Sequence, residues 1–93
     1  MRILGYIDHP VMKITVFRTD TRVSIKFEHR DFEQTYKFRP DIHTNSLVEI
    51  RQLVDETFAQ AVMKRFQQME RDLGGTFGRN LPSTPDELFP NIV

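Results

Sequence analysis

Residues 11–18 read VMKITVFR, and apolar and polar side chains alternate over most of this stretch. A period of two is typical of a β-strand that buries one face. The pattern recurs over residues 22–28 and 32–39, and residues 2–7 form a further short apolar run. Each connection between these stretches has three residues, and connections that short join antiparallel neighbours. We therefore expect a four-stranded antiparallel meander.

The alternation divides the expected strands into two faces. In the first strand either Ile3 and Ile7 or Leu4 and Tyr6 could point inward, and we expect Ile3 and Ile7. In the other three strands one apolar set stands out and should form the core face of the sheet. Its members are Met12, Ile14, Val16, Val23, Ile25, Phe27, Phe32, Tyr36 and Phe38.

The opposite face of the expected sheet is polar and mildly basic. Residues 1–40 carry a net charge of +3, whereas residues 41–93 carry −3. Cations that track phosphates and a ring that stacks a base are the components of a single-stranded nucleic-acid surface. Glu28 and Glu33 interrupt this face and the pI is only about 6.8, so an ordinary solvated face is the preferred interpretation. The candidate nucleic-acid residues are Lys13, Phe17, Arg22, Lys26 and Lys37.

A helix follows the strands. Ser46 and Glu49 form a capping-box pattern, in which each side chain satisfies a backbone N–H at the start of a helix. From Leu47 to Leu73 apolar residues recur at steps of mostly three and four, and no Pro or Gly intervenes before Gly74. We expect one unbroken helix over residues 46–73, a C-cap at the glycines and a loop over residues 76–80. The fold class is thus α+β, a four-stranded antiparallel meander followed by one long helix packed on one sheet face.

The expected helix is longer than the sheet that it should cover. Twenty-eight residues of helix span about 42 Å, whereas a seven-residue strand spans about 23 Å. The apolar stripe would continue past the sheet, so we expect a second copy of the chain to cover it in a homodimer. The alternative is that apolar residues of the tail fold back over the same stripe. The candidate dimer seam is Val62, Phe66, Met69 and Leu73, and the tail residues are Phe77, Leu81, Leu88, Phe89 and Ile92.

Length and composition exclude several kinds of protein and of functional site. The 93 residues suffice for one domain, which we expect over residues 1–75, with a loop and tail over 76–93 and a short helical turn at 85–89. The absence of Cys excludes disulfides and thiolate sites, and His9, His29 and His43 all fall in expected turns. We therefore expect no catalytic site, metal or cofactor. No apolar run reaches the ~20 residues of a membrane span, which makes the cytoplasm the default location.

Two resemblances add to this interpretation. The order of a four-stranded meander and one long helix resembles the single-stranded-DNA-binding transcriptional coactivator fold and the purine-rich-element-binding repeat. That likeness is one of topology and implies dimerisation and nucleic-acid binding. Separately, residues 4–10, LGYIDHP, and residues 33–38, EQTYKF, look like a small bacterial protein family with no assigned activity. We expect a non-enzymatic interaction module, homodimeric or bound to another protein, with nucleic acid as the disfavoured alternative.

Overall fold

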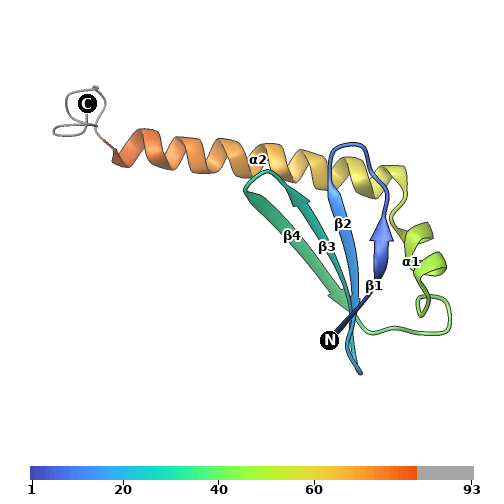
Figure 1. Cartoon of the computed structure of the whole chain (residues 1–93). Coiled ribbons are helices and arrows are strands. Elements are labelled where there is room, and N and C mark those ends of the chain that lie inside the picture. Colours follow the sequence, from blue (N-terminus) through green and yellow to red (C-terminus); the bar gives the residue numbers. More distant parts are fainter. Residues whose placement is uncertain (82–93) are drawn as a thin grey trace.

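A computed structural model describes residues 1–81 of the chain. Within this range each strand pairs antiparallel with the next, in the sheet order β1-β2-β3-β4, and two helices follow (Figure 1). This confirms the expected α+β meander. The elements are β1 (Arg2–Ile7), β2 (Lys13–Arg18), β3 (Val23–His29), β4 (Phe32–Phe38), α1 (Leu47–Leu53) and α2 (Glu56–Asn80).

The core lies between α2 and one face of the sheet, which we call the inner face. The register pairs Ile14 with Phe27 and Val16 with Ile25, so the apolar sets of neighbouring strands share this face. Edge-to-face ring contacts connect it to α2, since the Phe58 ring lies 5.5 Å from that of Phe27. The buried hydrophobic residues are Ile7, Met12, Ile14, Val16, Val23, Ile25, Phe27, Ile50, Val62 and Phe66.

The first strand differs from the expectation because it contains a β-bulge. Ile3 pairs with Phe17 but Gly5 pairs with Val16, so Leu4 is an extra residue in β1. The bulge shifts the alternation by one position. Ile7 is buried as expected, but Ile3 is 52% exposed on the opposite face, and Leu4 packs against the core in its place. The expectation that Ile3 points inward was therefore wrong.

Gly5 makes room for α1 at this bulge. A Cβ atom on Gly5 would lie 2.5 Å from a methyl carbon of Leu47, the first residue of α1. Real Cβ atoms do not approach another atom so closely, so any side chain here would displace Leu47. The close approach lets α1 pack beside β1 and bury Ile50 completely.

The single helix expected over residues 46–73 is two helices in the structure. Ser46 and Glu49 do form the capping box at the start of α1, as expected. The helix then stops at Val54, and the Asp55 side chain accepts a hydrogen bond of 2.8 Å from the Phe58 N–H as the N-cap of α2. The break separates two packing directions, because α1 stands beside β1 while α2 crosses the inner face (Figure 1).

The far end of the helix also differs from the expectation. Gly74 and Gly75 do not terminate α2, which continues to Asn80 with Leu81 as its C-cap. Residues 76–80 are therefore helix and not loop. The 25 residues of α2 span about 37 Å, and its second half extends past the sheet (Figure 1). The expected turn at residues 85–89 lies outside the described residues.

Candidate interaction surfaces

The predicted dimer seam divides into a buried and an exposed part. Val62 and Phe66 are fully buried against the chain's own sheet, at 0% and 1% exposure, and Phe66 packs against the ring of His29. They cannot contact a second chain without unfolding, so their assignment to the seam was wrong. Met69 is half-buried and packs against the core, whereas Leu73 is exposed. The seam hypothesis thus survives only for the part of α2 beyond Met69.

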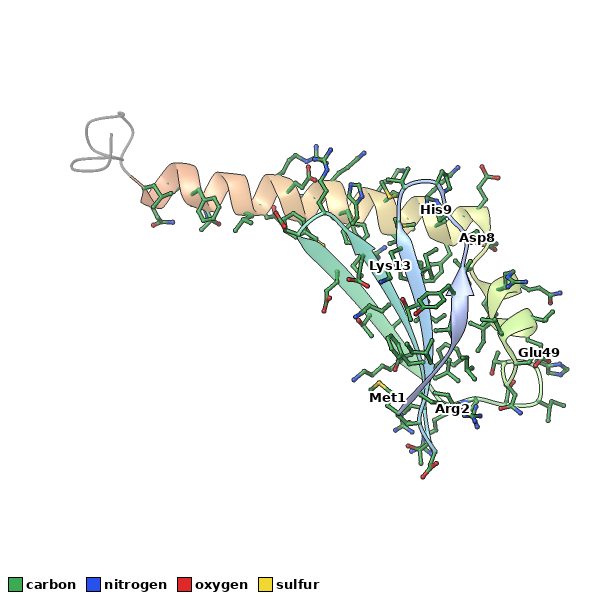
Figure 2. All side chains as sticks on the ribbon, viewed as in Figure 1. Met1, Arg2, Asp8, His9, Lys13 and Glu49 are labelled. Carbon is green, nitrogen blue, oxygen red and sulfur yellow. The ribbon has the colours of Figure 1, made fainter. Side chains whose placement is uncertain are left out.

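This exposed part, residues 70–81, is here called the projecting end. Its large apolar side chains recur at steps of four and so lie along one side of the helix. Leu73 is 42% exposed, Phe77 52% and Leu81 47%. Figure 2 shows the side chains of this end standing clear of the sheet. A row of half-exposed apolar residues on a helix that extends past its own sheet is typical of an interaction surface.

The glycines of the projecting end weaken it as an isolated helix. Gly74, Gly75 and Gly78 each cost about 1 kcal/mol relative to Ala inside a helix. A Cβ atom added at Gly74 or Gly78 would meet nothing within 4 Å, so the described part of the chain does not require glycine there. Short-range hydrogen bonds partly compensate, such as that of 2.9 Å from the Thr76 hydroxyl to the Asp72 carbonyl. Most helices depend on tertiary contacts for their stability, and within residues 1–81 the one hydrogen bond from this end to another element joins Glu70 to Arg30.

The outer face of the sheet, opposite α2, holds most of the candidate nucleic-acid residues. Lys13, Phe17 and Lys26 project from β2 and β3 and Lys37 from β4, as their register positions require. Arg22 precedes β3 and lies in a hollow at the end of the sheet, with Asp20, Thr21, Arg39 and Pro40. Lys13 and Lys37 are four residues and two strands apart, or about 17 Å. The five residues therefore do not converge on one groove.

A lysine ammonium lies against each of the two aromatic rings of the outer face. The Lys26 ammonium lies 5.4 Å from the centre of the Phe17 ring and 3.7 Å from a Glu28 carboxylate oxygen. The Lys13 ammonium, labelled in Figure 2, lies 6.0 Å from the centre of the Tyr6 ring. A nucleic-acid base would have to displace these cations before it could stack. Nucleic-acid binding on this face stays a prediction that these contacts disfavour.

The histidines and acidic residues take local structural roles. His29 is the last residue of β3 and not part of a turn as expected, and its ring packs on Phe66. His9 Nδ1 accepts hydrogen bonds from the N–H groups of Val11 and Met12, 3.1 Å each. The Asp41 carboxylate accepts from the His43 N–H at 2.7 Å, which lowers the pKa of Asp41. Residues 1–81 contain no cluster of three or more metal-ligating side chains.

The core contains one polar link that the sequence pattern did not reveal. Gln34 lies on the inner face of β4, and its amide nitrogen donates a hydrogen bond of 2.9 Å to the backbone carbonyl of Val62 in α2. The Tyr36 hydroxyl donates in turn to the Gln34 side-chain oxygen at 2.9 Å. These bonds set the position at which α2 crosses β4, and hence the point beyond which it projects.

Comparison of the chain with protein-family models, curated proteins and solved structures finds no match in any of the three. Of the two helices in the described range, neither is long and apolar enough to cross a membrane.

Proposed function

We propose that this chain is a non-enzymatic interaction module that acts as a homodimer, joined through the projecting end of α2. One observation carries the proposal: Leu73, Phe77 and Leu81 lie half-exposed on a helix that extends beyond its own sheet. Burying three such side chains would stabilise the complex by roughly 1 kcal/mol each, since about half of each is still accessible. That gain would offset the cost of the three glycines.

The charges of the molecule favour a second copy as the occupant. The chain has no net charge, so two copies approach without long-range repulsion. The projecting end is also balanced, because Glu70 and Asp72 carry the opposite charge to Arg71 and Arg79. A strongly acidic or basic partner would find no complementary patch here. Closed two-fold dimers are moreover the commonest oligomers.

Sedimentation equilibrium of the wild type and of Phe77→Glu tests the proposal. The wild type should sediment at twice the 11.0 kDa of one chain at high micromolar concentration. Phe77→Glu should sediment as a monomer, because a carboxylate in the apolar contact would be desolvated without a partner. Phe77 packs on no residue of the core, so this variant should keep its circular dichroism spectrum.

Ile42→Glu is the matched control. Ile42 is 83% exposed in the turn before α1, so the same change of charge occurs away from the projecting end. This variant should stay dimeric. A monomeric wild type, or equal dissociation of both variants, would overturn the proposal, and a monomeric wild type would favour the alternative that the chain's own tail covers the stripe.

A further inference from the structure

The β4 edge of the sheet is open. Within residues 1–81 β4 pairs only with β3, so every second residue turns its backbone N–H and C=O away from the sheet. The opposite edge, β1, has α1 beside it (Figure 1). Seven residues of unpaired edge are a template for another strand, and natural proteins usually cover or block such an edge.

The sequence of β4 is complementary to itself in the antiparallel direction. Residues 32–38 read FEQTYKF, and reversal about Thr35 places Glu33 opposite Lys37 in both halves. The same reversal places Phe32 opposite Phe38 and Gln34 opposite Tyr36. Opposite charges and aromatic pairs are the cross-strand combinations that stabilise a sheet. An axis moved to residue 33 or 37 would instead place like charges opposite each other.

The charges on the outer face support this register independently. Glu28 and Glu33 lie directly opposite each other on β3 and β4, which is unfavourable for two carboxylates. Within residues 1–81 neither Glu33 nor Lys37 has an ion-pair partner. A second β4 in the antiparallel register would bring one lysine beside each such glutamate.

We infer that β4 pairs antiparallel with β4 of a second copy, about a two-fold axis at Thr35, to form a continuous eight-stranded sheet. The inference rests on the proposed homodimer and specifies its interface. An axis perpendicular to the sheet keeps both inner faces on the same side. α2 leaves the sheet beside the β3–β4 turn, where Glu70 pairs with Arg30 (Figure 1). In the antiparallel register this end of β4 adjoins the Phe38 end of the second copy's strand, so each projecting end would begin next to the other copy.

The area of the projecting end favours such a second contact. Three half-exposed side chains, each of about 200 Å² in full, contribute roughly 300 Å². A stable interface buries about 800 Å² per partner. The helix contact alone is therefore smaller than a standard interface, and the β4 edge would add backbone hydrogen bonds and the half-buried Phe32 and Phe38.

Disulfide cross-linking tests the register, and the absence of Cys makes single replacements clean. In Thr35→Cys the two thiols face each other across the axis, with Cα atoms about 4.5–5.5 Å apart, which a disulfide can bridge. Mild oxidation should convert most of this variant to a covalent dimer on a non-reducing gel. Lys37→Cys is the control on the same strand and face, since its two thiols would be about 14 Å apart and should not cross-link.

A charge exchange provides the second measurement. Glu33→Lys and Lys37→Glu should each raise the dimer Kd about tenfold, because two opposite-charge pairs per dimer become like-charge pairs. The double variant Glu33→Lys/Lys37→Glu should return to within about threefold of the wild type, since it restores both pairs with reversed polarity. Each variant changes exposed residues, and circular dichroism verifies the fold.

The outcomes separate this inference from the proposed homodimer. If the wild type is dimeric but Thr35→Cys cross-links no faster than Lys37→Cys, the strand pairing is overturned while the helix contact stands. Absence of rescue in the double variant would overturn the register in the same way. If the wild type is monomeric, the homodimer fails and the strand pairing fails with it.

Discussion

The two halves of α2 have the same backbone conformation and opposite surroundings. Residues 56–69 lie on the sheet, contain no glycine and bury Val62 and Phe66 completely. Residues 70–80 contain three glycines, and within residues 1–81 their one ion pair with another element joins Glu70 to Arg30 in the β3–β4 turn at 3.3 Å. The first half is helical because it packs, whereas the second has neither packing nor high helix propensity. The comparison shows that, within residues 1–81, packing on the sheet supports only the first half of the helix.

The largest expected difference between the halves concerns two phenylalanines. Phe66→Ala should lower the free energy of unfolding by about 3–5 kcal/mol, because it leaves a cavity against the sheet. Phe77→Ala should change it by less than about 0.5 kcal/mol in the monomer, since within residues 1–81 the ring does not pack against the core. Urea unfolding at low micromolar concentration, where a weak dimer dissociates, measures both. Similar losses for the two variants would show that Phe77 packs within its own chain.

A smaller effect is expected where α2 begins. Asp55→Ala removes the side chain that caps the Phe58 N–H and should lower the free energy of unfolding by about 1 kcal/mol. Asp55→Asn is the control, because an amide oxygen caps nearly as well and should recover most of the loss. Equal losses for both variants in urea unfolding would mean that the carboxylate charge, and not the cap, stabilises this end.

The sequence predicted the strands well because each one has a buried and an exposed face. Residues 2–7 were expected as a strand and form β1, and the apolar sets of β2 and β3 fill the core as expected. The bulge at Leu4 was not predicted. Residues 2–7 form one apolar run whether or not a residue is inserted, so the sequence pattern does not reveal the shift. A period-two pattern shows which residues alternate, and an inserted residue changes which of them point inward.

The helices were predicted less accurately, for a physical reason. Ile50, Val54 and Phe58 follow one another at steps of four, so the apolar periodicity continues across the break at Asp55. Asp55 followed by Glu56 is itself a helix N-terminus signal that the periodicity concealed. The exposure of Leu73 beyond the sheet could be predicted from the length of the apolar stripe. The burial of Val62 and Phe66 could not be predicted from the stripe. It depends on where α2 lies over the sheet, and the hydrogen bond from Gln34 to the Val62 carbonyl helps to set that position.

The smallest expected effect tests whether the projecting end is held only by its own backbone in the monomer. In Gly78→Ala the new methyl group meets nothing within 4 Å, so the change should stabilise this end by up to about 1 kcal/mol through helix propensity alone. Amide hydrogen exchange over residues 71–80 should then slow by up to about fivefold, with no change for the strands. Ala59→Gly in the packed half is the reverse control: Ala59 packs against the core, so its loss should lower the stability of the whole domain. If Gly78→Ala leaves exchange unchanged, or if it protects the strands as well, the projecting end does not open independently of the sheet.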